Sequence, residues 1–355
     1  MTERSTGRAD ARIKKEMEFV KAVCAAILFM ALSAVDTQAA DYNITTFAIP
    51  PESPSSSGAE GIYGINNLGQ ILGNGDLTQG GFLRGPDGSI QDIDIPQSMG
   101  SGAQFRGLND LGQTVGIFPT GDSQQHAFVR ASDGSTVEIK ADDYGSITAL
   151  GINNAGVAVG SAARFRGYSS AGYFYDGVSL NLISMPGAVN TIATGINDAG
   201  RIVGYFDYGL TDDTRGFVRE VNGTIETFRV PSSFPTGDAR PTAPFDINNH
   251  GEIVGMFLPD NSGRRGFVRH SDGSYDTFDL PNLLDTIATG INDEGVIVGR
   301  YHFMEENAEL TRWRGFEARP VAAVPIPTTF WLLSAAFGLL GTTQRHCDHP
   351  RNHNR

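Results

Sequence analysis

The stretch TGINDAGRIVGYFD, residues 194–207, places glycines and an Asn-Asp pair among β-branched residues. Segments of this composition form phosphate loops, metal loops or tight turns, so one copy does not identify the structure. Its core recurs, however, as GINNLGQILG from Gly64, GLNDLGQTVG from Gly107, GINNAGVAVG from Gly151, GINDAGRIVG from Gly195, DINNHGEIVG from Asp246 and GINDEGVIVG from Gly290. The spacing of about 44 residues is typical of a four-stranded propeller blade.

Two further elements follow each copy in a fixed order. The first is GFLR from Gly81, AFVR from Ala127, GYFY from Gly172, GFVR from Gly216, GFVR from Gly266 and GFEAR from Gly315. The second ends mostly in proline, as in IETFRVP at 225–231, and its sixth copy is missing after GFEAR. It occurs instead ahead of the first repeat, as YNITTFAIP at 42–50. A ring must join its last blade to its first, so we predict a six-bladed β-propeller closed by this N-terminal strand.

The chemistry inside a repeat is that of strands and turns. β-Branched Ile196, Ile202 and Val203 suit strands, and the body shows no sustained helical period, so the predicted class is all-β. Asx and glycine residues between the strands tolerate the backbone angles of a hairpin. The predicted structural turn residues are Asn66, Asn67, Gly69, Asn109, Asp110, Gly112, Asn153, Asn154, Gly156, Asn197, Asp198, Gly200, Asn248, Asn249, Gly251, Asn292, Asp293 and Gly295.

Two functional interpretations of these turns compete with the structural one. A phosphate loop leads from a strand into a helix, and no helical pattern follows any copy. A calcium loop requires several carboxylates at alternating positions, whereas three copies have one Asp and three have Asn instead. We therefore expect turns, with no cofactor and no metal.

Catalytic constellations are sparse. Paired carboxylates occur at Asp92 and Asp94, Asp142 and Asp143, and Asp212 and Asp213, in polar contexts where solvation explains them. The DGS sequences at Asp87, Asp133 and Asp272 fit hairpin turns. The histidines of the body, His126, His250, His270 and His302, lack metal-ligand spacing. We predict a protein that is not an enzyme, with ligand contacts expected in the irregular insertions at 161–170, 207–214, 232–243 and 302–311.

Composition excludes other classes of function. The net charge of −13 argues against a non-specific binder of nucleic acid. Both cysteines, Cys24 and Cys347, lie near the ends of the chain, so the body holds no disulfide. The first 40 residues have a basic start, an apolar run and a small-residue exit, which predicts a signal peptide and hence export. Met17 is an alternative start.

The repeats at 41–320 resemble the bacterial extracellular HAF family, which implies an exported protein. Residues 321–355 resemble a PEP-CTERM sorting signal in its VPxP form, with Val324, Pro325, Ile326, Pro327 and Trp331 in the signature and Arg345 in the polar tail. That resemblance implies processing by an exosortase-type enzyme in a Gram-negative bacterium that makes exopolysaccharide. The short apolar run suits transient membrane association, and a simple hydrophobic tail is the alternative.

Two functional hypotheses follow. The first is a periplasmic, cell-surface or extracellular propeller without enzymatic activity, which binds surface polysaccharide or protein, or supports the envelope or the biofilm matrix. The second is a carbohydrate-active enzyme, a glycosidase or lyase, on the same scaffold. Fold alone does not separate them. An enzyme would require carboxylates converging with an arginine or an aromatic platform in one pocket.

Overall fold

The computed structural model describes residues 42–321 apart from 51–60, 76–79, 95–98, 101, 121–123, 142, 165–168, 210–212, 232–240, 260–262, 279, 281–284 and 305–310. The described residues up to Pro320 belong to one compact unit, and Val321 falls outside it. The described part of this unit is all-β and contains no α-helix. Accordingly, none of the described residues belongs to a helix with the length and apolarity to cross a membrane.

Four antiparallel sheets have four strands each. The first contains β2 (Gly61–Ile65), β3 (Ile71–Asn74), β4 (Gly81–Arg84) and β5 (Ile90–Ile93). The second contains β6 (Gln104–Leu108), β7 (Thr114–Pro119), β8 (Gln125–Arg130) and β9 (Thr136–Ile139). The third contains β18 (Thr242–Ile247), β19 (Ile253–Phe257), β20 (Arg265–Arg269) and β21 (Tyr275–Phe278). The fourth contains β22 (Thr286–Ile291), β23 (Ile297–Met304), β24 (Thr311–Pro320) and β1 (Tyr42–Phe47).

A fifth sheet has eight strands in two antiparallel halves. One half contains β10 (Tyr144–Ile152), β11 (Ala158–Arg164), β12 (Ser170–Tyr175) and β13 (Leu180–Ile183). The other contains β14 (Asn190–Ile196), β15 (Ile202–Asp207), β16 (Arg215–Arg219) and β17 (Ile225–Phe228). A single parallel bridge, Ser170 with Asn190, joins the halves. Each half thus repeats the strand order of the other sheets.

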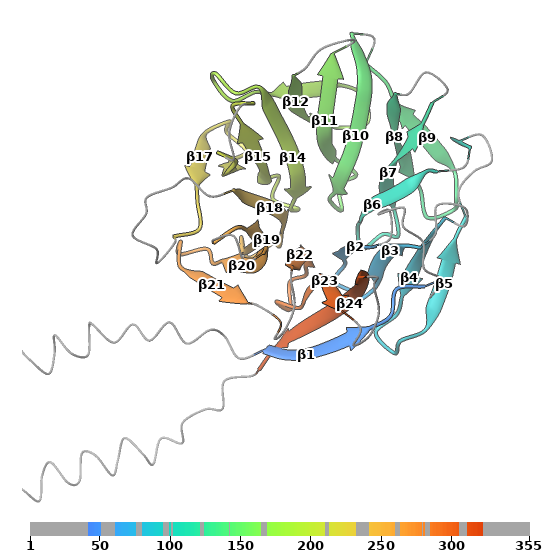
Figure 1. Cartoon of the computed structure of the whole chain (residues 1–355). Coiled ribbons are helices and arrows are strands. Elements are labelled where there is room, and N and C mark those ends of the chain that lie inside the picture. The colour runs from blue at the N-terminus through green and yellow to red at the C-terminus, as the bar shows by residue number, and fades with distance from the viewer. Residues whose placement is uncertain are drawn as a thin grey trace, which may run out of the picture. The chain divides into compact units, whose positions relative to one another are not determined.

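The sheets stand around a common axis in a propeller-like arrangement, with the first strand of each repeat nearest the centre (Figure 1). These inner strands contact one another in the cyclic order β2, β6, β10, β14, β18, β22 and back to β2. β1 pairs with β24 over six residues, from Tyr42 with Pro320 to Phe47 with Gly315. The displaced strand predicted from the sequence therefore completes the last sheet.

Glycine spacing in the repeat follows from this packing. Gly204 on β15 lies opposite Phe217 on β16, and a Cβ there would lie 2.7 Å from the Phe217 ring and 2.0 Å from the Ile192 carbonyl oxygen. Near the axis, a Cβ on Gly290 would lie 2.8 Å from the Gly64 Cα. Side chains are excluded at both places, because the strands approach so closely.

The core lies between neighbouring sheets. One cluster joins Val115 and Ile139 of the second sheet to Ile147, Ala158 and Tyr173 of the next repeat. Comparable clusters lie between the other repeats. Each sheet buries apolar surface against its neighbours, so the arrangement depends on the complete circle.

Candidate functional site

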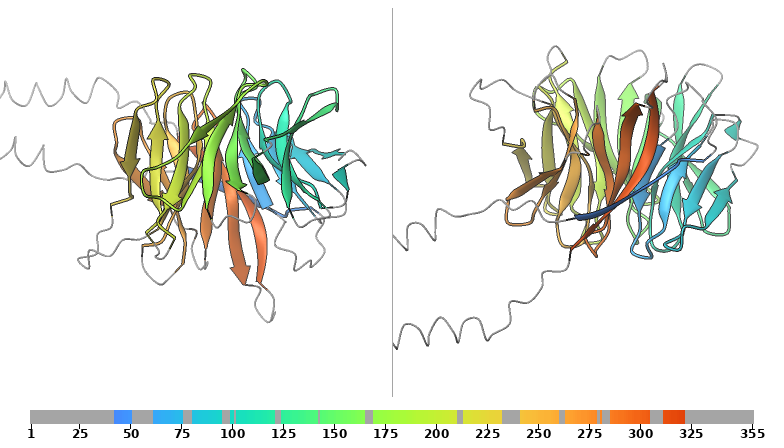
Figure 2. Two further views of the ribbon diagram at one scale, coloured as in Figure 1. Left: turned by 90° about the horizontal axis from the view of Figure 1, so that it is seen from above. Right: turned by 60° about the horizontal axis from the view of Figure 1, so that its bottom comes forward.

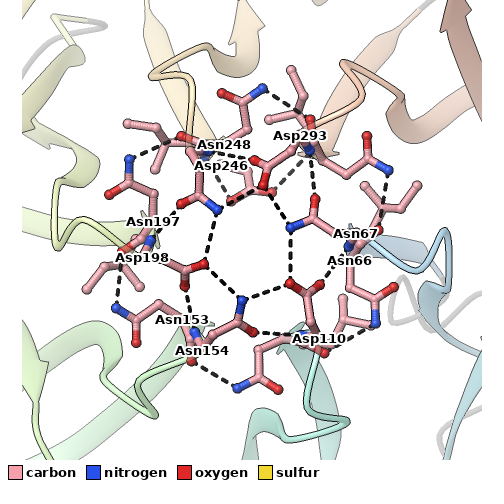
Figure 3. Close-up of a pocket in the computed structure, with 18 of the residues that line it drawn as sticks. Asn66, Asn67, Asp110, Asn153, Asn154, Asn197, Asp198, Asp246, Asn248 and Asp293 are labelled. Atoms are coloured by element: carbon pink, nitrogen blue, oxygen red, sulfur yellow. Dashed lines mark hydrogen bonds between the residues drawn. The ribbon is translucent and has the colours of Figure 1, made fainter.

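The repeated turns converge on the axis and line a central cavity of about 70 Å³. The Asn-[Asn/Asp] pair of all six turns contributes to its wall (Figure 3). Glycine completes each turn; Gly200, for example, has φ of +79°, which favours glycine. The predicted turn residues therefore lie at one end of the channel between the inner strands.

The first asparagine of each turn forms what we call the buried ring, consisting of Asn66, Asn109, Asn153, Asn197, Asn248 and Asn292. In Asn153, Oδ1 accepts hydrogen bonds from the backbone N–H groups of Ala155 (3.1 Å) and Val157 (3.0 Å), which fixes the turn. Nδ2 donates to the backbone carbonyl of the next ring member, and the six such bonds measure 2.9–3.3 Å. The bond from Asn292 to Asn66 closes the cycle.

The second residue of each turn forms the Asn/Asp ring, in which the two residue types alternate as Asn67, Asp110, Asn154, Asp198, Asn249 and Asp293. Each backbone N–H donates to Oδ1 of the following member at 2.7–2.9 Å. Each asparagine Nδ2 donates to Oδ2 of both flanking aspartates at 2.8–3.0 Å. Alternation therefore gives every amide hydrogen an acceptor and separates the three carboxylates (Figure 3).

The Asn/Asp ring is a closed cycle of hydrogen bonds between neighbouring repeats. Both hydrogens of each asparagine amide are used, and each carboxylate accepts three charge-assisted hydrogen bonds. In the part of the chain that the structure describes, no group of three His, Cys, Asp or Glu side chains has a geometry that could hold a metal ion. The arrangement stabilises the junctions between repeats, with its three aspartates evenly spaced.

A second cavity, of about 30 Å³, lies behind the first and shares Ile65, Ile152 and Asp246 with it. Asp246 stands where five of the repeats have glycine. Its carboxylate accepts hydrogen bonds from the backbone N–H groups of Ile247 (2.9 Å) and Ile291 (3.1 Å). The Asp246 residue as a whole is half-buried, because it lines both cavities. Its carboxyl group, however, is surrounded by protein. Burial raises its pKa to about 7, against the lowering effect of the two hydrogen bonds.

The residue directly before each repeat core also lines this second cavity. Five residue types occupy this position in the six repeats, and only threonine occurs twice: Tyr63, Arg106, Leu150, Thr194, Phe245 and Thr289. The guanidinium carbon of Arg106 lies 4.5 Å from the centre of the Tyr63 ring. Arg300 of β23 lies against the same ring at 5.8 Å. Away from the turns, the channel is therefore lined by unlike residues.

Arg300 also contacts Trp313 at 4.8 Å, and the ring of Trp313 stacks on His302 at 3.9 Å. We call Tyr63, Arg106, Arg300, His302 and Trp313 the arginine–aromatic cluster. Burial is the main cause that lowers the pKa of Arg300, and the positive charge of Arg106 adds to it, while Tyr63 opposes it. Two cations thus share one aromatic ring.

Other predicted residues lie apart from the channel. Asp87, Asp133 and Asp272 each accept hydrogen bonds from the backbone N–H and the hydroxyl of the serine two residues later. These bonds lower the pKa of all three carboxyl groups, chiefly the one from the serine hydroxyl. The DGS sequences therefore form local turns.

The histidines and the paired carboxylates do not converge. His126 contacts Glu138 at 2.5 Å, and His270 bridges Glu252 and Asp276 at 3.1 and 2.9 Å. His250 lies in a repeat turn. Among the nominated carboxylates, Asp213 pairs with Arg215 and Arg229, and the other described members, Asp92, Asp94 and Asp143, are exposed. None of these residues lines the two central cavities.

Several predictions lie outside the described residues. They include the signal peptide, the sorting residues Val324, Pro325, Ile326, Pro327, Trp331 and Arg345, the acids Asp142 and Asp212, and much of the irregular insertions. The described cavities are formed by the repeated turns and by the residue before them, not by the described parts of the insertions. Two sequence signals correspond to these cavities: the strict alternation of Asn and Asp at the second turn position, and the variation of the residue directly before each repeat core. The prediction of turns depended on neither signal.

Comparison with known proteins gives a partial family match. Residues 138–273 match the model of a protein family of unknown function, DUF3466. No curated protein matches the sequence significantly.

Solved structures resemble the chain at low identity. A streptogramin B lyase is 15% identical, with 80% of this chain and 99% of that one covered and a TM-score of 0.43. A gluconolactonase from Xanthomonas campestris is 11% identical, with coverages of 81% and 92% and a TM-score of 0.48. TolB from Acinetobacter baumannii is 13% identical, with coverages of 70% and 66% and a TM-score of 0.46.

Proposed function

We propose that this protein is a non-enzymatic propeller that serves as a binding or structural module of a bacterial envelope or exopolysaccharide matrix. The observation that carries the proposal is the Asn/Asp ring. Its three carboxylates occupy equivalent positions, and each is held by three N–H donors. Glycosidases instead require two carboxyl groups in different roles across a substrate cleft.

We also infer that the ring has six blades. The two halves of the eight-stranded sheet share only the Ser170–Asn190 bridge, and each contributes one turn to both rings of hydrogen bonds. Counting the halves separately gives one blade per repeat. The pairing of β1 with β24 then joins the chain ends within the sixth blade.

Export and sorting belong to the same proposal and rest on the sequence. The segment at 1–40 would direct export, and the segment at 321–355 would be handled by an exosortase-type enzyme during transient membrane association. Mass spectrometry of the mature C-terminus in the producing cell tests this proposal. We expect the tail to be removed, and a mature surface protein intact through Arg355 would contradict sorting.

One observation favours the alternative of a carbohydrate-active enzyme. Asp246 is a carboxyl group with its pKa raised to about 7 by burial, and it shares a cavity with Arg106 and Tyr63. A protonated carboxyl at neutral pH is what a general acid requires. The hydrogen bond from the Ile291 N–H gives it a structural role instead, because this bond ties β18 to β22.

The test uses the full-length chain with acidic and neutral oligosaccharides. Calorimetry measures binding, and chromatography of the same mixtures detects shortened or unsaturated products. We expect binding without product. Product formation that Asp246→Asn abolishes in a folded protein would establish the enzyme and refute the proposal.

A further inference from the structure

We propose that the arginine–aromatic cluster is a binding site for a carboxylate-bearing sugar residue, a uronate unit of an acidic polysaccharide. The inference rests on the proposed binding function and specifies where and what the protein binds. It is carried by the charge, the burial and the geometry of the five side chains of this cluster.

The arrangement of the two arginines is the first argument. Arg106 and Arg300 come from different sheets, β6 and β23, yet both lie over the ring of Tyr63. Gly61 leaves room for this arrangement, because a Cβ there would lie 2.7 Å from a terminal nitrogen of Arg300. The fold therefore brings two guanidinium groups to one aromatic ring, and Arg106 and Tyr63 of this group line the second cavity.

Electrostatics is the second argument. Arg106 and Arg300 are half-buried and repel one another, and no ion pair found among the described residues includes Arg106. One terminal nitrogen of Arg106 donates to Oε1 of Gln104, while the buried Nε has no hydrogen-bond partner among the described residues. Partly desolvated like charges are costly unless an anion offsets them. A ligand carboxylate next to Arg106 would supply that charge and accept hydrogen bonds from the guanidinium fork.

Aromatic surface is the third argument, and it favours a sugar over a small inorganic anion. Trp313 and Tyr63 are half-buried, and other members of the cluster lie against both rings. Ligand sites combine such apolar faces with a few polar groups that fix orientation. β23 and β24, with eight and ten residues, extend beyond the other strands at one face (Figure 2) and carry His302 and Trp313. The hairpin thus adds an aromatic wall beside the arginines.

The negative net charge of the chain limits where an acidic glycan can bind. At −13 the chain as a whole repels a polyanion. Affinity for an acidic glycan must therefore come from a few cationic side chains, and removing one should have a large effect. A neutral glycan offers no partner for the guanidinium groups and should bind much more weakly.

Calorimetric titration of the full-length chain tests the site, with a tetramer of galacturonic acid as the acidic probe and maltotetraose as the neutral probe. We expect saturable binding of the acidic probe, with about tenfold or greater weakening in Arg106→Gln. Arg106→Lys keeps the positive charge but loses the guanidinium fork, so its affinity for the acidic probe should lie between those of wild type and Arg106→Gln. Arg219→Gln is the matched control. Arg219 lies on strand β16, outside the cluster, and its guanidinium carbon lies 5.1 Å from the centre of the Phe174 ring.

A second measurement avoids changing the cluster. The chain has two tryptophans, so Trp331→Phe leaves Trp313 as the only one. The acidic probe should then change tryptophan fluorescence with the same midpoint as calorimetry, and the neutral probe should not.

The outcomes separate this site from the general function. Equal affinity in wild type, Arg106→Gln and Arg219→Gln, or a silent Trp313 despite binding, would overturn the site and leave the binding function standing. Binding of maltotetraose but not of the acidic probe would do the same. Conversion of either probe into products would instead overturn the non-enzymatic function.

Discussion

The two cavities on the central axis are built on opposite principles. Around the first, the repeats supply the same residue types at equivalent positions, and their hydrogen bonds form closed cycles. Around the second, the position directly before each repeat core holds Tyr63, Arg106, Leu150, Thr194, Phe245 and Thr289. Repetition produces closure, because each unit must bond to the next in the same way. Recognition of one ligand requires unlike groups, so it is found where the repeats differ.

Opening the circle of sheets should have the largest effect on stability, because both cavities depend on the closed circle. Removal of residues 42–50 deletes β1 and exposes the edge of β24, together with core contacts of Ile49 and Phe47. We expect the melting temperature to fall by about 10 °C or more. A chain that starts at residue 42 is the control. If both chains melt at the same temperature, β1 does not close the circle.

The buried ring comes next. Asn153→Ala removes two turn hydrogen bonds and the bond to Asn197, so the backbone N–H groups of Ala155 and Val157 lose this acceptor. We expect the free energy of unfolding to fall by about 3 kcal/mol. Asn181→Ala, on the outer strand β13, should cost less than about 0.5 kcal/mol. Denaturant unfolding measures both, and similar losses would contradict a special role for the ring.

Alternation in the Asn/Asp ring can be broken in two ways. Asp198→Asn forces an amide against three N–H donors, whichever way it points. Asn154→Asp puts a carboxylate between Asp110 and Asp198 and removes two donated bonds. Each should lower stability by about 1–2 kcal/mol at pH 7.

The Asn154→Asp loss should shrink when added salt screens the repulsion between carboxylates, and more so than the Asp198→Asn loss. Equal salt dependence of the two losses would show that like-charge repulsion does not cause the Asn154→Asp loss.

Asp246 should give a smaller effect, visible in pH dependence. Its folded pKa, raised to about 7, lies above the unfolded value of 3.8, so the folded state binds the proton more tightly between these values. The contribution of Asp246 to stability is therefore lost as pH rises from about 4 through about 7. Asp246→Asn cannot ionise, so its melting temperature relative to wild type should rise by about 2 °C or more from pH 5 to pH 8. A constant difference would contradict an ionising buried carboxyl.

Much of the fold was predictable from the sequence. The period, the strand content and the displaced strand at 42–50 follow from local patterns, and the structure has the strand order that they imply. The turns were also predictable, because Asx and glycine residues act within a few positions. Hydrogen bonds between repeats were not, since Asn153 and Asn197 meet only after the strands circle the axis. The arginine–aromatic cluster depends likewise on β2, β6, β23 and β24 converging across the chain.

In our proposal the repeated turns close the protein, and the arginine–aromatic cluster binds its ligand. The decisive measurement is the affinity of Asp198→Asn and Arg106→Gln for the galacturonic acid tetramer, taken where both variants remain folded. We expect Asp198→Asn to melt earlier but to bind within about twofold of wild type, while Arg106→Gln keeps its melting temperature and binds about tenfold more weakly. A folded Asp198→Asn that no longer binds, beside an Arg106→Gln that does, would contradict it.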